Sequence, residues 1–441
     1  MGKRFCASVF PAMLAFAFSG VYAIVDGFFV GQNVGDVGLA GIGIAYPMTA
    51  IIQAVGTGIG MGGAVHIATC LGRGDAEGAR RYLGNTLTLL LLGGILVMAL
   101  LFATYWFLLP VMGAQGAVLK EATTYATIIQ LGALFQVMAT GLTPILRNYG
   151  ASILAMCAMI SGFVTNIVLD YLLVSVIPLG MAGAALATII GQAVTTVPCI
   201  WFLLRRKRSE LSRASLTPQR AVCASILKVG ISPFGLSMSP NLVIICMNKS
   251  AMVYGGDTAV AAYTVVAYVV SIIQYLLQGV GDGSQPLISF YQGQREYATA
   301  KRVRNMAYLT AFFTAALFLA LCWGLRYGIP IFFGASEQAA ALTAQALPLF
   351  AVGALFMAFL RVTTAYFYSL QKNGAAYCLV YGEPCLLLLL LLFVLPPLLG
   401  LWGVWLSTPV TQGILLLAGG ALLLANRNTV PHALEQPLPD K

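Results

Sequence analysis

The sequence predicts an all-α integral membrane protein with twelve transmembrane helices in two parallel-repeat six-helix lobes. Hydrophobic residues make up 59% of the 441-residue chain and charged residues only 9%, whereas a typical soluble domain contains about 25% charged residues. Apolar stretches of roughly 20 residues or more, long enough to cross a bilayer, follow one another along the chain. The second half of the chain also repeats the first at a near-constant offset.

The twelve expected spans are separated by short polar segments. Glycine and proline occur inside several of them, as is common in membrane helices. The spans are expected at residues 8–30, 40–71, 83–111, 118–146, 153–177, 180–204, 223–254, 257–291, 301–333, 338–369, 374–398 and 400–425.

The repeat can be followed residue by residue. Residues 39–81 align with residues 260–302 at an offset of 221, and a later block aligns at an offset of 220. The aligned pairs include Gln53 with Gln274, Gly58 with Gly279, Gly62 with Gly283, Gly180 with Gly400, Thr188 with Thr408 and Gln192 with Gln412. Because six spans lie in each half, the two halves share one orientation. Such duplication is typical of transporters in which one lobe rocks against the other around a site between them.

The net charge of +10 is explained by membrane topology rather than by nucleic-acid binding. Under the twelve-span arrangement the basic residues outside the spans gather on one side, and the opposite loops contain only Lys120 and Arg326. This positive-inside distribution predicts that both termini and residues 205–222 are cytoplasmic. The nine cysteines have no metal-ligand spacing and are expected to be packing residues.

The basic segment 205–222 is expected to be a cytoplasmic linker. It joins an N-terminal six-helix lobe, residues 1–204, to a C-terminal six-helix lobe, residues 223–425. A lipid-binding segment is possible, because a basic residue near an anionic leaflet gains about 1 kcal/mol, but a solvated tether is favoured. Residues 426–441 are expected to form a disordered cytoplasmic tail.

Ionisable residues inside the first lobe indicate a cation site. Charges at the bilayer centre are costly and usually face a partner or a water-filled cavity. Asp26 lies in span 1 and Asp170 in span 5, with Asn166 one turn before Asp170 on the same helix face. Shifted by the repeat, the two acids fall on Asn248 and Leu390. A cation site confined to one lobe would explain this asymmetry, and with Thr188 it would offer oxygen donors suited to H⁺ or Na⁺.

The second lobe contains its own ionisable residues within spans. Asp282, Arg361 and Glu383 are expected at similar depth, and Lys249 is expected to snorkel toward the outer surface. Two interpretations remain open. The residues form a structural ion pair that reduces the desolvation cost, or they line a substrate cavity and set its charge preference.

The chain resembles the multidrug and toxic compound extrusion (MATE) transporters over essentially its full length. The resemblance rests on an acid in span 1, an Asn-to-Asp motif in span 5 and the duplication. The matching stretches are residues 25–31, 58–75, 166–170, 183–188, 256–263 and 285–289.

The resemblance implies two six-helix bundles that export organic cations in exchange for H⁺ or Na⁺. It assigns the cation-coupling site to Asp26, Asn166, Asp170 and Thr188, and it places a bend of span 1 at Pro11. We therefore expect Pro11 to be a gating residue that bends span 1 when the cation site changes occupancy.

The chain departs from the family pattern in the second lobe. Asn241 stands where some members carry a glutamate in span 7, so the chain is similar to the bacterial branch without that acid. An arginine usual in span 11 is absent near residues 381–383, and Gln412 replaces an acid of span 12. These departures put the usual preference for cationic drugs in doubt. The substrate cavity is expected to include Asp282, Arg361, Glu383 and Asn241.

The predicted function is secondary active antiport by alternating access. The chain is expected to export organic, cationic or amphipathic compounds in exchange for H⁺ or Na⁺, without a cofactor, as a monomer in a bacterial inner membrane. Its partners are then a small drug-like substrate and the lipid bilayer, with no nucleic acid.

The sequence leaves two other classes of function as alternatives. A flippase of lipid-linked oligosaccharides is supported by Lys249 and Arg361 but opposed by the acids of the first lobe. A membrane enzyme is disfavoured because no metal spacing, nucleophile–base pair or phosphate loop is present.

Overall fold

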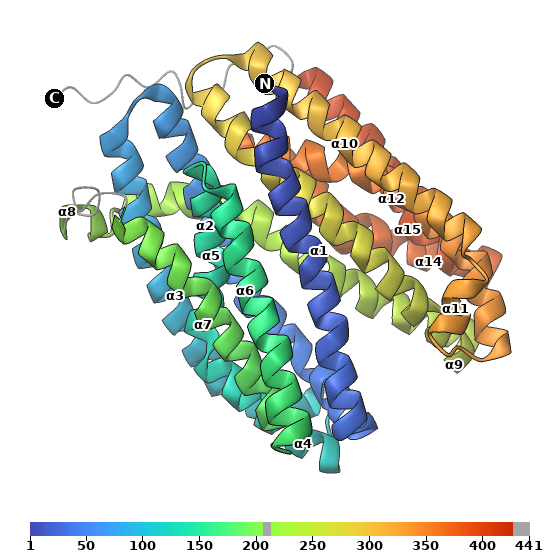
Figure 1. Ribbon diagram of the computed structural model, residues 1–441. Helices are drawn as coiled ribbons and strands as arrows, with labels where there is room; N and C mark the ends of the chain where they lie inside the picture. The colour runs from blue at the N-terminus through green and yellow to red at the C-terminus, as the bar shows by residue number, and fades with distance from the viewer. Residues whose placement is uncertain (206–212, 427–441) are drawn as a thin grey trace. The chain divides into compact units, whose positions relative to one another are not determined.

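The described residues of the chain form helices joined by short turns. The computed structural model describes residues 1–205 and 213–426, and within them no strand occurs (Figure 1). The all-α prediction is therefore confirmed. The expected tail, residues 427–441, and linker residues 206–212 lie outside the described part.

The first half contains six expected spans, of which the fourth is bent. The helices α4 and α5 meet at 57° beside Gly132, where a Cβ atom would collide with the Ile189 side chain. The elements are α1 (Gly2–Asn33), α2 (Asp36–Arg73), α3 (Ala76–Val111), α4 (Gly116–Leu131), α5 (Ala133–Asn148), α6 (Ser152–Asp170), the π-helix η1 (Tyr171–Val176), α7 (Met181–Arg205) and α8 (Arg213–Leu216).

The second half begins with the longest helix, α9, which contains two spans. At about 1.5 Å per residue its 74 residues would extend about 110 Å, far beyond a bilayer. The helix breaks at Gly256, whose φ is 62°. The elements are α9 (Arg220–Gly293), α10 (Tyr297–Gly324), α11 (Gly328–Phe332), α12 (Glu337–Ser369), α13 (Asn373–Gly382), the π-helix η2 (Glu383–Leu387), α14 (Leu388–Leu399) and α15 (Leu401–Ala425).

These elements account for twelve spans. Ten helical segments in the described residues are long and apolar enough to cross a membrane, and the bent α4–α5 pair is an eleventh. The break in α9 divides that helix into two, which supplies the twelfth.

The turns between spans repeat with the same offset as the sequence. Each left-handed backbone position of one half has a counterpart 220 or 221 residues later, except Gly116. The pairs are Gly35 and Gly256, Gly74 and Arg295, Gly113 and Gly334, Gly150 and Gln371, and Gly180 and Gly400. Arg295 and Gln371 thus adopt a backbone conformation that glycine supplies in the first half. The duplication therefore extends to the geometry of the turns.

Packing divides the chain within α9, into unit 1 (Met1–Met238) and unit 2 (Ser239–Lys441). The first turns of α9 belong to unit 1 because glycines of α2 let the two backbones touch. A Cβ atom on Gly62 would collide with the Ile226 carbonyl oxygen, and one on Gly58 would lie 3.0 Å from that of Gly230. Small residues at such contacts are typical of membrane helix packing. The division by packing thus falls later than the 205–222 linker.

The described part of the linker is hydrogen-bonded to α3. The fully buried Asn85 side chain accepts a hydrogen bond from the Gln219 N–H at 2.7 Å and donates one to the Ser215 carbonyl at 3.3 Å. The Thr88 hydroxyl donates to the Leu216 carbonyl at 2.8 Å. Residues 216–220 are exposed, as expected of a solvated tether, but side chains of α3 also fix the backbone of the linker.

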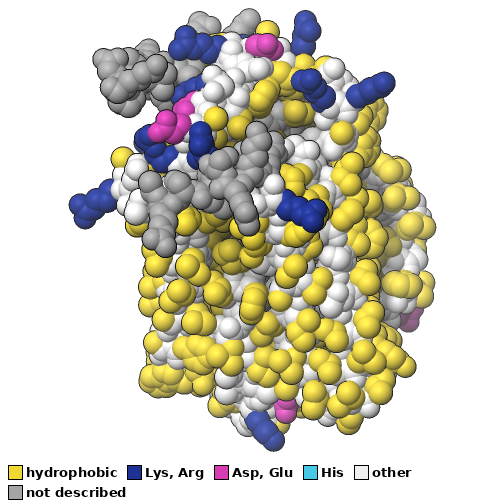
Figure 2. All heavy atoms as spheres, turned by 60° about the vertical axis from the view of Figure 1, so that its left-hand side comes forward, with side chains coloured by type: hydrophobic (Ala, Val, Ile, Leu, Met, Phe, Trp, Pro, Cys, Tyr) yellow, Lys and Arg dark blue, Asp and Glu magenta, His cyan; other side chains and the backbone are white. Residues whose placement is uncertain are grey.

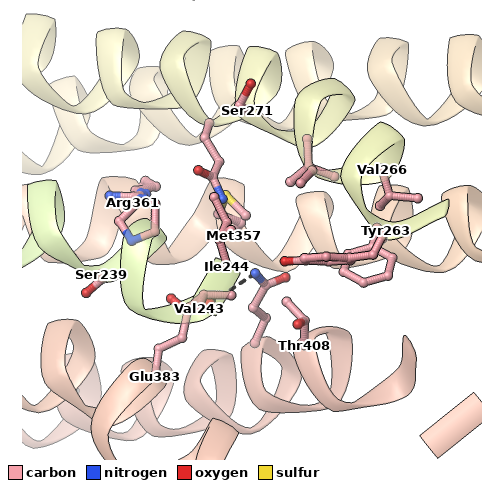
Figure 3. Close-up of a pocket in the computed structure, with 16 residues that line it drawn as sticks. Ser239, Val243, Ile244, Tyr263, Val266, Ser271, Met357, Arg361, Glu383 and Thr408 are labelled. Atoms are coloured by element: carbon pink, nitrogen blue, oxygen red, sulfur yellow. Dashed lines mark hydrogen bonds between the residues drawn. The ribbon is translucent and has the colours of Figure 1, made fainter. Parts of the chain in front are cut away.

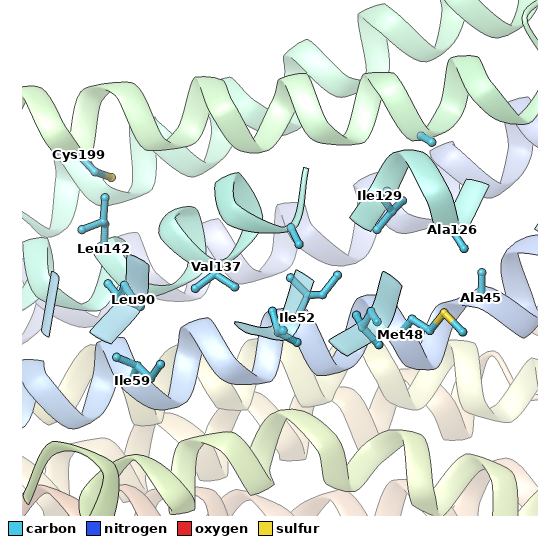
Figure 4. Close-up of a cluster of buried hydrophobic side chains, with 14 of the residues drawn as sticks. Ala45, Met48, Ile52, Ile59, Leu90, Ala126, Ile129, Val137, Leu142 and Cys199 are labelled. Atoms are coloured by element: carbon cyan, nitrogen blue, oxygen red, sulfur yellow. The ribbon is translucent and has the colours of Figure 1, made fainter. Parts of the chain in front are cut away.

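Unit 1 has an apolar core between α2, α3, α4, α5 and α7. Figure 4 shows Met48 and Ile52 of α2 beside Ile129 and Val137 of α4 and α5. On the face shown in Figure 2, hydrophobic side chains predominate and charged ones are few, as expected of a lipid-facing surface.

Candidate functional sites

The buried acids of unit 1 come together in one site. Asp26 of α1 is 9% exposed, and Asp170 at the end of α6 is fully buried. Their carboxyl groups interact with each other directly. When both are ionised, Oδ1 of each acid is buried without a hydrogen-bond partner. The two unpartnered oxygens give this site capacity to bind a proton or a cation.

Asn166 and Thr188 complete this carboxylate site, which we define as Asp26, Asn166, Asp170 and Thr188. The Asn166 amide has two orientations. In one, its nitrogen donates to the Thr188 hydroxyl at 3.5 Å. In the other, its nitrogen donates to Asp170 Oδ2 and its oxygen accepts from the Thr188 N–H, both at 3.2 Å, which satisfies both amide atoms. The second orientation is preferred because it leaves fewer polar groups unpaired.

Two glycines bring α6 and α7 close enough for these contacts. A Cβ atom on Gly162 would lie 2.6 Å from the Gly191 carbonyl oxygen, and one on Gly191 would lie 3.1 Å from the Asn166 Cβ. Larger residues would force the helices apart and separate Asn166 from Thr188. The local sequence therefore positions the polar pair.

Three tyrosines around the carboxylate site were not anticipated from the sequence. Tyr125 of α4 is buried beside Thr188, Tyr22 lies near both acids, and Tyr46 lies near Tyr22 and Tyr125. Tyr22 stacks on Phe163 with ring centroids 5.1 Å apart. A signal for Tyr22 was present, because residues four apart share a helix face and Tyr22 precedes Asp26 by one turn. No comparable signal pointed to Tyr46 or Tyr125.

The chemistry of the carboxylate site suits a hard cation or a proton. Its donors are oxygen atoms of carboxyl, amide, hydroxyl and phenol groups. Within the part of the chain that the structure describes, no group of three or more His, Cys, Asp or Glu side chains is arranged to hold a metal ion. Two facing carboxylates repel each other, so a proton or cation between them stabilises the pair. Asp170 also directly precedes the π-helix η1, a feature frequent at functional sites.

Unit 2 contains a pocket with a buried arginine, which we call the arginine pocket. Arg361 of α12 and Glu383 at the start of η2 both line it (Figure 3). Gln412 of α15 donates to Glu383 Oε1 at 3.2 Å. Nη1 of Arg361 is buried without a hydrogen-bond partner in the described residues. The other polar lining residues are Ser239, Tyr263, Ser271, Gln274 and Thr408.

The structure does not gather all the expected cavity residues in this pocket. Arg361 and Glu383 line it, whereas Asp282 and Asn241 do not. Asp282 is buried close to Arg361 and accepts a hydrogen bond from the Tyr368 hydroxyl at 3.2 Å. Of the four, only Arg361 and Glu383 therefore present charge to the pocket.

The repeat relates the arginine pocket to the carboxylate site. Thr408 of the pocket is the counterpart of Thr188 in the site, and the pocket residues Gln274 and Gln412 are counterparts of Gln53 and Gln192. Applying the offset to the Thr188 position could therefore have identified Thr408 from the sequence.

Pro11 lies in the same continuous helix as Asp26, about 22 Å away at 1.5 Å per residue. It is therefore too distant to contact the acid.

Comparisons with known proteins cover nearly the whole chain. The MatE family model matches residues 11–172 and 237–380. The multidrug export protein MepA of Staphylococcus saprophyticus is 26% identical over 436 residues, which are 96% of this chain and 94% of that protein. MepA of Staphylococcus haemolyticus is 24% identical, with the same coverage.

A solved structure of the same fold is the outward-facing conformation of a multidrug resistance MATE family transporter of the MOP superfamily. It superposes with a TM-score of 0.90 at 24% identity and covers 97% of both chains.

Proposed function

The chain belongs to the MatE family of membrane transporters, and on that premise we propose that it exports organic compounds by antiport with a cation bound at the carboxylate site. As a member of this family it is a transporter and not an enzyme. The export of drug-like compounds is supported by the multidrug export relatives, which match almost end to end. We further propose a bacterial cell membrane location with both termini cytoplasmic, for which the basic loops are the support.

The observation that carries the proposal is the Asp26–Asp170 pair. Two acids buried in membrane spans, each with an unpartnered oxygen, are costly unless their charge is neutralised. Binding and release of a cation would change the net charge of this site. Coupling follows if the two conformations of the transporter differ in cation affinity, because a ligand shifts an equilibrium only by its differential affinity.

We favour a proton over Na⁺ as the coupling ion. In its better-satisfied orientation Asn166 turns its amide nitrogen toward Asp170, and its oxygen accepts from the Thr188 backbone. One of the two lone pairs of the amide oxygen is then used in a hydrogen bond, which makes this oxygen a weaker ligand for Na⁺. A proton shared between the two carboxyl groups requires no further ligand. For Na⁺, the ligands would be Asp26, Asp170, Thr188 and an Asn166 amide turned the other way.

The arginine pocket is the proposed substrate site of unit 2. Its lining combines apolar walls from residues such as Val243, Ile244 and Met357 with the charges of Arg361 and Glu383. Ligand sites with mostly apolar walls and a few polar groups are common. This composition supports amphipathic substrates.

Transport in proteoliposomes tests the coupling. The purified full chain is reconstituted, and movement of ethidium, a lipophilic cation, is followed under a pH gradient alone and a Na⁺ gradient alone. We expect the pH gradient to drive transport and the Na⁺ gradient to have no effect. Transport driven only by Na⁺ would reassign the coupling ion, and equal movement in protein-free vesicles would contradict antiport. Glu77→Gln is the matched control, because that carboxylate is 83% exposed.

A further inference from the structure

We propose that a second pocket in unit 2 binds the phosphate-bearing headgroup of an anionic membrane lipid. This basic pocket lies at the beginning of α10 and the ends of α12 and α15. It is lined by Lys301, Arg304, Lys372, Tyr366, Leu423 and Leu424, among others. The helices α10 and α15 each pack on α12 (Figure 1). The pocket is separate from the arginine pocket and shares no lining residue with it.

The three cations of the basic pocket converge from two segments that are distant in the sequence. Lys301 and Arg304 lie one turn apart near the beginning of α10, on the same side of the helix. Lys372 follows the end of α12, and its Nζ donates to the Asn426 carbonyl at the end of α15, at 3.1 Å. Burial and the nearby Lys301 both lower the pKa of Lys372. An anion between these groups would relieve their repulsion.

The arginine is held in place before any ligand binds. Its guanidinium lies over the rings of Tyr366 and Tyr308, 4.9 and 5.5 Å from their centroids. Nε and Nη2 both donate to Asn305 Oδ1, at 3.2 and 3.0 Å. A stacked guanidinium loses little further freedom on binding, and its planar fork suits phosphate.

The apolar residues in the pocket wall favour a lipid over a soluble anion as the ligand. Leu423 and Leu424 stand beside the cations, and Leu424 is 72% exposed. Phe367 and Leu370 form further apolar lining. A phosphate bound by the cations would leave acyl chains to cover these leucines. Basic pockets between membrane helices on the cytoplasmic side bind anionic headgroups in this manner.

Binding of defined lipids to the purified full-length transporter tests this proposal without requiring transport. Retained lipid is counted by native mass spectrometry, and the shift in unfolding temperature is measured with phosphatidylglycerol, phosphatidylcholine and inorganic phosphate. We expect retention and stabilisation by phosphatidylglycerol only. Arg304→Gln and Lys301→Gln should each weaken it about fivefold, since each basic residue near a membrane surface is worth about 1 kcal/mol.

Arg302→Gln is the matched control, because Arg302 is exposed on the same turn of α10 but does not line the pocket. Equal loss of phosphatidylglycerol binding in Arg302→Gln and Arg304→Gln would reduce the effect to general surface charge and overturn the proposal. Saturation by inorganic phosphate that blocks the lipid would assign the pocket to a soluble anion instead. Lys301→Gln, an exposed position, keeps the test valid if Arg304→Gln does not fold.

Discussion

At the scale of single residues, substitutions in the Asp26–Asp170 pair should affect transport activity without lowering the stability of the fold. Replacing either acid by asparagine removes a buried negative charge that faces another one. We therefore expect Asp170→Asn and Asp26→Asn to lower gradient-driven export at least tenfold without lowering the unfolding temperature. Export is measured in proteoliposomes and stability by thermal unfolding of the same preparations.

The control for this pair is Glu77→Gln, which should match the native protein in both assays. Export at the native rate by both asparagine variants would eliminate the carboxylate site as the coupling site. A large loss of stability would mean that the carboxylates serve the fold, since a structural pair is destabilised when one member is removed.

Arg361 and Glu383 should have opposite effects on substrate charge. They line one pocket, so removing the arginine favours cations and removing the glutamate favours anions. We expect Arg361→Gln to raise the export of a cationic dye relative to an anionic dye at least threefold, and Glu383→Gln to lower this ratio. Competition between the two dyes in one vesicle preparation measures the ratio directly.

Arg326→Gln is the matched control for Arg361, because that guanidinium lies over Trp323 and Tyr327 and outside the arginine pocket. If Arg361→Gln and Glu383→Gln move the ratio in the same direction, charge is not what these residues contribute.

At the scale of elements, α1 contains Pro11, which lies far from Asp26 but is expected to bend the helix when the carboxylate site changes occupancy. Proline removes one backbone hydrogen bond and clashes with the preceding turn, so the helix can bend there. We expect Pro11→Ala to slow turnover severalfold while the apparent affinity for the coupling ion stays within twofold. Spin labels flanking Pro11 should report a distance that changes between low and high pH in the native chain. A constant distance in a transport-active sample would make Pro11 a static feature.

The attachment of the linker backbone to α3 depends largely on one buried side chain, that of Asn85. Truncating Asn85 removes its hydrogen bonds to the backbones of Ser215 and Gln219, a loss of about 1–3 kcal/mol. We expect Asn85→Ala to lower the unfolding temperature and to accelerate proteolytic cleavage between α7 and α9. Thr104→Ala is the control on the same helix, because its hydroxyl bonds only within α3 in the described contacts. Unchanged cleavage in Asn85→Ala would show that other contacts hold the linker.

At the scale of the whole molecule, the basic loops predict which ends of the spans face the cytoplasm. In a background without native cysteines, we expect Gln115→Cys to react with a membrane-impermeant maleimide in intact cells. Gln294→Cys should react only after the membrane is opened. Both positions are exposed and follow an odd and an even span respectively. The reverse pattern would invert the proposed orientation.

Much of the architecture was predictable from the sequence because it follows from local free energies. The cost of placing polar groups in hydrocarbon requires long apolar helices, so the spans could be located without tertiary contacts. The duplication was visible in the spacing of glycines, and it extends to the turn backbones, where Gly74 and Arg295 share one conformation. The same cost made Asp26 and Asp170 conspicuous as candidates for a cation site.

Only the tertiary structure decided which of the polar side chains meet. A membrane helix is apolar on every face, so its periodicity does not say which face turns toward a neighbour. The contact of Asn166 with Thr188 depends on the close approach at Gly162 and Gly191. Likewise, packing placed Arg361 and Glu383 in one pocket and left Asp282 outside it. Composition and spacing thus determined what crosses the membrane, whereas helix rotation and backbone proximity determined where the charges meet.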